Sequence, residues 1–265
     1  MTELWTATKR GWGRLVAGRR ASSVIGTRPI RDRARAFNLF ALVLLAAILS
    51  IAFFDAPIAH FARTADPDLT ALFRAFTDLA KADWMLVGSG VLGLALIPTV
   101  AVLKSRARAA AGAWVGVCAF AFAAIAGSGI AVNVLKVLFG RGRPRTFEMD
   151  GAFVLAPLTI DPIYASFPSG HATTAFAFAA TIALFAPRYR VGLLALATML
   201  AISRVVVGAH YLSDVLAGAM LGIAFTLVLA AVFHRRGLVF AVRRGQLTPK
   251  APRALLWPLR RLFRP

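Results

Sequence analysis

Cysteine is nearly absent from this chain, because Cys118 is the only one among 265 residues. A single cysteine cannot close an intrachain disulfide, and Cys118 lies in an apolar run, so a disulfide scaffold and a thiolate metal cluster are excluded. Acidic residues are also few, with 11 Asp and Glu against 31 Lys and Arg and a formal net charge of +20. This excess favours binding to polyanions, which are either nucleic acids or anionic lipid surfaces.

The chain also lacks the long polar stretches of a soluble domain, since 59% of its residues are hydrophobic. A helix needs about 20 apolar residues to cross a bilayer. No long polar/apolar alternation is present, which argues against a transmembrane barrel. The sequence therefore predicts an all-α, polytopic integral membrane protein, a bundle of six transmembrane helices at about 37–54, 84–103, 109–139, 171–186, 191–208 and 212–233.

Apolar residues at helical spacing also occur between the first two predicted spans. Leu69, Leu72, Phe73, Phe76 and Leu79 follow this pattern. We therefore expect residues 57–82 to form an amphipathic helix at the outer membrane interface.

The charges predict the topology. Nine basic residues precede Phe37 and nine follow His234, the latter without any acid. The positive-inside rule then places both termini in the cytoplasm. The first apolar run begins after 36 residues and no small-residue cleavage site follows it, so we interpret it as a retained span. The predicted division is a basic cytoplasmic segment at 1–36, a six-span domain at 37–233 and a basic cytoplasmic tail at 234–265.

The basic tails carry no recognised nucleic-acid motif and directly flank spans, so orientation and anionic-lipid contact are favoured over nucleic-acid binding. Apolar residues in both tails lie near one helical face and predict segments on the bilayer surface. These residues are Trp5, Trp12, Val16, Leu255, Leu256, Leu259 and Phe263. We expect membrane lipids, and not nucleic acid, to be their partners.

Ionisable residues at span ends are energetically expensive and are candidates for function. With the N-terminus inside, the third and fifth spans end outside, and the fourth and sixth begin there. Six separated residues then meet at the outer face: Lys136, Arg143, His171, Arg204, His210 and Asp214.

Lys136, Arg143 and Arg204 can neutralise phosphoryl oxygens, because guanidinium groups offer paired donors and ammonium a point charge. The alternative for each cation alone is snorkelling to lipid headgroups. The run from Pro168 to His171 favours phosphate, since Ser169 supplies a hydroxyl and Gly170 lets a helix N-terminus approach an anion closely.

His210 and Asp214 are four residues apart, so a helical turn would let the carboxylate accept one imidazole N–H. The other nitrogen is then free to attack phosphorus. His171, on a different helix, is a candidate for protonating the departing oxygen and later activating water. We assign structural roles to His60 and His234.

These residues stand in an order that resembles the three-part signature of the type 2 phosphatidic acid phosphatase superfamily. The first part is Lys136, six residues, then Arg143 and Pro144. The second is the run from Pro168 to His171. The third is Ser203 and Arg204, five residues, His210, three residues and Asp214.

The resemblance implies that His210 is the nucleophile, Asp214 its orienting partner and His171 the leaving-group acid. It implies phosphate binding by Lys136, Arg143, Ser169, Gly170 and Arg204. It also implies no metal and no cofactor, which agrees with the lack of a carboxylate cluster near these motifs. Vanadium-dependent haloperoxidases share the signature, but six apolar spans and the lack of a soluble helical domain argue against that class.

The resemblance implies a metal-independent lipid phosphate or diphosphate phosphatase. The loop charges predict that it acts at the outer face of the cytoplasmic membrane, and the Ala- and Arg-rich composition suggests a bacterium. Three substrates stay open: a polyprenyl diphosphate, phosphatidylglycerophosphate or phosphatidate, and a lipid A phosphate. We expect the loop at 145–167 to shape the pocket rim and the choice of substrate. The alternatives are a non-catalytic lipid-phosphate carrier or scaffold and a lipid phosphotransferase, and no oligomeric state is assigned.

Overall fold

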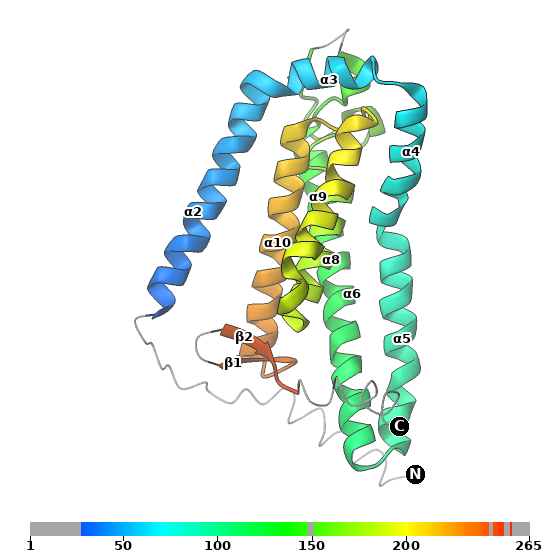
Figure 1. Ribbon diagram of the computed structural model, residues 1–265, viewed down its shortest axis with the longest axis vertical. Helices are drawn as coiled ribbons and strands as arrows, with labels where there is room; N and C mark the ends of the chain where they lie inside the picture. The colour runs from blue at the N-terminus through cyan, green and yellow to red at the C-terminus, as the bar shows by residue number, and fades with distance from the viewer. Residues whose placement is uncertain (1–27, 148–150, 244–245, 252–254, 256–265) are drawn as a thin grey trace.

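The computed structural model describes residues 28–147, 151–243, 246–251 and 255, and side-chain positions within these ranges except at 28–36 and 246. Long helices run in alternating directions along one axis (Figure 1). The predicted helical membrane protein is confirmed. The long helices of the bundle are α2 (Arg28–Leu49), α5 (Ala82–Val102), α6 (Ser105–Phe139), α8 (Gly170–Phe185), α9 (Arg190–Val206) and α10 (Leu212–Arg235).

Five helical stretches of the described chain are long and apolar enough to cross a membrane: Phe37–Arg63, Pro67–Val102, Ser105–Phe139, Pro187–Val206 and Leu212–Arg235. Helix α8 is apolar but has 16 residues. At about 1.5 Å per residue it extends roughly 24 Å, less than the ~30 Å hydrocarbon layer. Six crossings therefore remain a prediction.

Helix α2 and the two helical elements that follow it form one bent rod, which we call the first rod. Helix α2 continues through a π-helical turn, η1 (Ser50–Phe54), into α3 (Asp55–Arg63), and α3 lies across one end of the bundle (Figure 1). Large apolar side chains of α2, such as Phe37 and Leu42, are exposed, as expected for a surface that faces lipid. Ser50 and Asp55, in contrast, are buried. The bend thus brings polar groups of the first rod into the interior.

The amphipathic helix predicted at 57–82 is not continuous. Helix α3 is followed by a separate helix α4 (Pro67–Thr77) and a short turn η2 (Asp78–Ala80). Asp66 caps α4 by accepting hydrogen bonds from two backbone N–H groups of its first turn, at 2.7 and 3.2 Å. A capping Asp followed by Pro starts a new helix, which apolar spacing alone does not reveal. Helix α4 packs against α9 and continues towards α5 (Figure 1).

Helices α8 and α10 approach closely because α10 has glycine where they touch. A Cβ atom on Gly218 would lie 2.5 Å from the carbonyl oxygen of Ser169, and one on Gly222 would lie 2.3 Å from that of Thr173. Small residues spaced by four are typical of close helix packing in membranes. This contact fixes the beginning of α8 beside the beginning of α10.

A small β-hairpin departs from the all-α prediction. Strand β1 (Phe240–Arg243) pairs antiparallel with β2 (Gln246–Pro249), at the end of the bundle away from α3 (Figure 1). Phe240 is fully buried, and its ring lies 4.8 Å from that of Phe120 and 5.2 Å from that of Phe185. The excess of basic residues predicted a tail, but the short apolar strand packs onto the bundle. The boundary at residue 233 stays a prediction.

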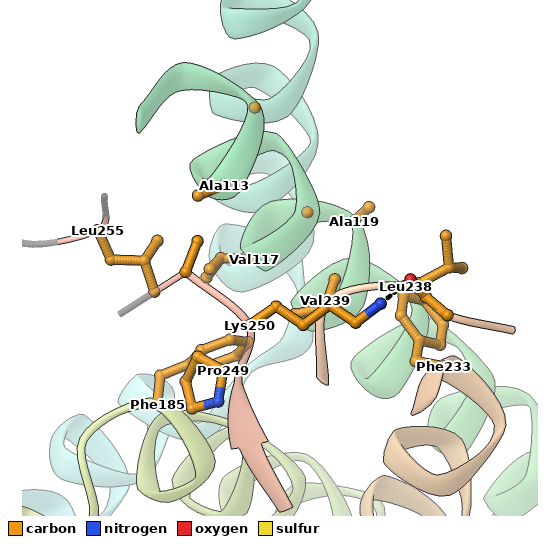
Figure 2. A pocket seen from close by; sticks show the side chains of 14 residues that line it. Ala113, Val117, Ala119, Phe185, Phe233, Leu238, Val239, Pro249, Lys250 and Leu255 are labelled. Atoms are coloured by element: carbon orange, nitrogen blue, oxygen red, sulfur yellow. Dashed lines mark hydrogen bonds between the residues drawn. The ribbon is translucent and has the colours of Figure 1, made fainter. Parts of the chain in front are cut away.

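An apolar pocket of about 350 Å³ lies between the hairpin and α6 (Figure 2). Lys250 extends along it, and its Nζ donates a hydrogen bond to the carbonyl oxygen of Gly237. Leu255 lines this pocket. The other apolar residues predicted to lie on the bilayer surface are outside the described residues: Trp5, Trp12, Val16, Leu256, Leu259 and Phe263.

Candidate active site

The residues selected from the sequence lie at the end of the bundle that α3 crosses, which we call the site end (Figure 1). Four helices bring them there, because α6 and α9 end where α8 and α10 begin. Lys136 is in the last turn of α6, Gly170 and His171 open α8, Arg204 is in the last turn of α9, Asp214 is in the first turn of α10, and Arg143, Ser169 and His210 lie in the connections.

The N-terminus of α8 lies at the centre of this group. Ser169 is its buried N-cap, with Oγ 3.5 Å from the backbone nitrogen of Ala172. The backbone N–H of Ser169 donates to the carbonyl oxygen of Asp214 at 3.0 Å. The Nζ atom of Lys136 lies 3.5 Å from the place where Gly170 would carry a Cβ. Residues from all three sequence motifs therefore meet at a helix end whose dipole favours anions.

The three cations surround this helix end from different elements. Arg204 Nη1 lies 3.3 Å from Thr77 Oγ1, and its buried Nε has no hydrogen-bond partner. Arg143 Nε donates to the carbonyl oxygen of Pro162 at 2.9 Å. The charge of Lys136 interacts with those of both arginines. Burial lowers the pKa of Arg143, and the neighbouring charge of Arg145 lowers it further. An anion bound between these cations would relieve their mutual repulsion.

His210 is held in one tautomer. Its Nδ1 lies 2.8 Å from the carbonyl oxygen of Ser166. Because a carbonyl oxygen only accepts, Nδ1 carries the hydrogen and Nε2 of the neutral ring carries the lone pair. Burial lowers the pKa of His210, and the charges of Arg143 and Lys136 lower it further. Asp214 acts in the opposite direction and raises it, but the net pKa is lowered. The ring is therefore neutral near pH 7, and its Nε2 carries the lone pair.

Asp214 lies near His210, but not in the direct hydrogen bond that the sequence suggested. The distance from His210 Nδ1 to Asp214 Oδ2 is 3.6 Å, which is an ion-pair distance only. Asp214 Oδ2 accepts from Ser166 Oγ at 2.5 Å and from the backbone N–H of Tyr211 at 2.9 Å. Ser166 thus links the carboxylate to the imidazole.

Sequence reasoning missed four residues of this site: Arg141, Asp55, Ser166 and Tyr211. Arg141 forms ion pairs with Asp55 and Asp214 at 2.8 and 2.7 Å, and its Cζ lies 4.3 Å from the centre of the Tyr211 ring. Burial raises the pKa of Tyr211 to about 12. A charge at the end of an apolar run is expensive, so Asp55 and Arg141 carried a usable signal. Ser166 carried none.

Within the described part of the chain, no group of three or more His, Cys, Asp or Glu side chains has an arrangement that could hold a metal ion. The cations are the groups present to balance phosphate charge. Metal independence stays a prediction.

The fold and this site define a class, a helical membrane protein with a cationic, imidazole-bearing site at one end of its bundle. A sequence model of the PAP2 superfamily matches residues 116–238. A lipid A 1-phosphatase of Rhizobium johnstonii is 38% identical over 266 residues, which cover 100% of this chain and 99% of the relative. A lipid A 1-phosphatase of Rhizobium etli is 39% identical over 243 residues, which cover 89% of this chain and 95% of the relative.

A solved structure has a similar fold. The first transmembrane PAP2-type phosphatidylglycerolphosphate phosphatase from Bacillus subtilis matches with a TM-score of 0.53 and 20% identity, over 78% of this chain and 98% of that one. The chain belongs to the PAP2 superfamily. It is a lipid phosphate phosphatase and a multi-pass bacterial membrane protein.

Proposed function

We propose that this enzyme removes the 1-phosphate of a lipid A-type glycolipid at the outer face of the cytoplasmic membrane, through a phosphohistidine on His210. The observation that carries the reaction type is the gathering of three cations and two imidazoles around the N-terminus of α8. The full-length similarity to two lipid A 1-phosphatases favours this substrate over polyprenyl diphosphates and phosphatidylglycerophosphate.

In the first half-reaction, His210 Nε2 attacks phosphorus and the bond from phosphorus to the lipid oxygen breaks. The negative charge of the bound phosphate favours the protonated form of His171, which gives its proton to that oxygen, and the oxygen leaves as the lipid hydroxyl. Lys136, Arg143 and Arg204 neutralise the non-bridging oxygens. The Ser169 hydroxyl and the Gly170 N–H donate to them from the start of α8.

In the second half-reaction, water attacks the phosphorylated His210. His171, now neutral, accepts a proton from this water as its oxygen bonds to phosphorus. The bond from phosphorus to Nε2 breaks, its electron pair returns to the ring and inorganic phosphate leaves. The charge of Asp214 stabilises the cationic phosphorylated ring from 3.6 Å.

The loop that holds Arg143 also offers a surface for the lipid chains. Its residues Phe153, Leu158 and Ile160 are 63, 74 and 89% exposed. The Leu158 N–H donates to the carbonyl oxygen of Val137 at 2.7 Å, so the loop runs back beside the last turns of α6. We assign these side chains to contact with acyl chains while the same loop holds Arg143 for phosphate.

Phosphate release in detergent with a chelator present tests the reaction. We expect turnover of lipid A 1-phosphate, slower turnover of phosphatidate and a polyprenyl diphosphate, inhibition by orthovanadate, and an acid-labile phosphoenzyme. His210→Ala should abolish both phosphoenzyme and turnover, whereas His60→Ala, at an exposed histidine, should keep them. Normal turnover by His210→Ala would exclude the mechanism, and preference for another lipid would exclude the substrate.

Labelling tests the orientation. In a Cys118→Ala background, Ile160→Cys at the loop should react with an impermeant maleimide in intact spheroplasts. Arg188→Cys, in the exposed connection between α8 and α9, should react only after permeabilisation. The reverse pattern would place the site in the cytoplasm.

A further inference from the structure

A buried arginine outside the proposed catalytic set lies between two buried carboxylates. Arg141 Nη1 donates to Asp214 Oδ1 at 2.7 Å and to Ser213 Oγ at 2.6 Å. Its Nη2 donates to Asp55 Oδ2 at 2.8 Å and to the carbonyl oxygen of Ala152 at 3.0 Å. All four N–H bonds of the terminal nitrogens therefore have protein acceptors. Arg141 does not offer its guanidinium fork to phosphate.

The second carboxylate comes from the first rod. Asp55 stands where η1 meets α3 and is fully buried. Besides Arg141, it accepts hydrogen bonds from Ser50 Oγ at 2.7 Å, from the backbone N–H of Ser213 at 3.1 Å and from the Ser213 hydroxyl. Asp55 thus joins the bend of the first rod to the beginning of α10.

A chain of contacts leads from this pair to His210. Arg141 holds Asp214 Oδ1, and the Ser166 hydroxyl holds Oδ2. The carbonyl oxygen of Ser166 in turn accepts the Nδ1–H of His210. With both carboxylate oxygens held, Asp214 cannot rotate to take the imidazole hydrogen itself. The tautomer and ring plane of His210 therefore depend on this network.

The balance of charge in the network matters as much as its geometry. One guanidinium between two carboxylates leaves a net charge of one negative unit. If Asp55 were neutral, Arg141 would cancel the charge of Asp214, and His210 would face no net negative charge from this side. The other charges around His210 are the cations of Lys136 and Arg143, with His171 across the site.

We infer that Arg141 and Asp55 are positioning residues: Arg141 fixes the Asp214 carboxylate, and Asp55 preserves the negative charge that supports His210 as it becomes cationic. The inference deepens the proposed function and rests on His210 as nucleophile. The terminal N–H bonds of Arg141 are all engaged by protein acceptors and Asp55 is fully buried, so we assign both an effect through Asp214.

Two neutralising substitutions give opposite expected results. Asp55→Asn makes the network less negative, so protonated His210 is less favoured, and the acid limb of the pH profile of kcat/KM should move about one unit lower. Arg141→Gln makes it more negative and should move that limb about one unit higher. We expect kcat of Asp55→Asn to fall about tenfold, because the cationic imidazole loses negative charge beside it. We expect kcat of Arg141→Gln to fall about 10²-fold, because the imidazole loses its alignment. KM should be unchanged in both variants.

The matched controls are Asp83→Asn and Arg106→Gln, at exposed positions, which should leave the profile in place. Arg141→Lys keeps the charge without the fork and should lower kcat without moving the limb. If Arg141→Gln does not fold, Arg141→Lys and Asp55→Asn still test the inference. Limbs that stay fixed, or that move in the same direction, would overturn it.

A readout without turnover separates this inference from the proposed function. The ring nitrogens of His210, in protein labelled with ¹⁵N-histidine, report its titration directly by NMR. The same opposite shifts are expected there. If the wild-type protein releases no phosphate but the opposite shifts are seen, the proposed function fails and the positioning role stands. If the wild-type protein releases phosphate but the His210 titration does not shift in the variants, the proposed function stands and the positioning role fails.

Discussion

The two ends of the bundle are held by different forces, although α6, α8 and α10 reach both. At the site end, Asp55, Arg141 and Asp214 are buried charges; the terminal guanidinium nitrogens of Arg141 bridge the two carboxylates, while its buried Nε has no hydrogen-bond partner. At the other end, which we call the hairpin end, the ring of Phe120 packs edge-on against neighbouring rings, among them Phe240. Removing one partner of a buried ion pair leaves the other charge unpaired, which is strongly destabilising. Truncating an apolar side chain instead lowers the free energy of unfolding in proportion to the atoms removed.

The difference suggests that chemistry and stability can be changed separately. A substitution at the site end should reduce activity more than stability, provided that it leaves no unpaired charge. A substitution at the hairpin end should do the reverse. The following predictions test this separation, beginning with the largest expected effect.

His210→Ala should lower kcat about 10³-fold or more, because the proposed nucleophile is lost. The midpoint of thermal unfolding in detergent should change little, because the buried ring is neutral and its loss leaves no unpaired charge. Phosphate release and unfolding are measured on one preparation, with His60→Ala as control. A large loss of stability would show that the site end also holds the fold together.

Phe120→Ala should lower the free energy of unfolding by about 3–4 kcal/mol, since the ring is fully buried. Its partners are the rings of Phe185, Phe233 and Phe240. The activity of the folded fraction should be retained. Phe122→Ala, on the same helix but 44% exposed, should change stability much less. A loss of activity without a loss of stability would contradict the separation.

Gly218→Ala tests the contact that carries α8 to the site end. The added Cβ would lie 2.5 Å from the carbonyl oxygen of Ser169, so the start of α8 must shift. A displacement of about 1 Å at the proposed phosphate-binding turn should lower kcat about 10²-fold. Gly88→Ala is the control, because nothing lies within 4 Å of its Cβ. Equal kinetics for the two variants would show that the glycine contact does not position the site.

The smallest expected effect is on the pH dependence of stability. Burial lowers the pKa of His210 below the ordinary value of 6.5, so the unfolded chain binds its proton first as the pH falls. The contribution of His210 to the free energy of unfolding is therefore fully present above pH 6.5. It decreases below pH 6.5, by at most about 1.4 kcal/mol per pH unit. His210→Asn should show a flatter dependence between pH 6.5 and 5 in urea unfolding. An unchanged slope would mean that His210 is solvated in the folded protein.

Much of the fold could be predicted because the hydrophobicity of an apolar run acts locally. The spans near α5, α6, α9 and α10 were found within several residues, since their composition alone requires a membrane. The capped break at Asp66 and the strand at Phe240 were not. Both are short features whose outcome depends on packing against α9 and Phe120.

The sequence selected residues that the fold brings together at one end of the bundle, but it did not predict their contacts. The motif spacing picked out His210 and Asp214, yet the hydrogen bond to the imidazole comes from the Ser166 carbonyl, a backbone group without a sequence signature. Asp55 follows directly after the first predicted span, where no contact was expected, yet it is buried beside Arg141, 86 positions away. Pairing at such distances is invisible in a linear pattern.

The sequence by itself determined that this chain enters a membrane as helices and carries cationic and imidazole groups where those helices end, because hydrophobicity and charge act residue by residue. Only the tertiary structure decided which groups share a proton or a counter-ion. Such pairing depends on separations of about 3 Å, and these exist only once α3, α6, α8 and α10 are packed together.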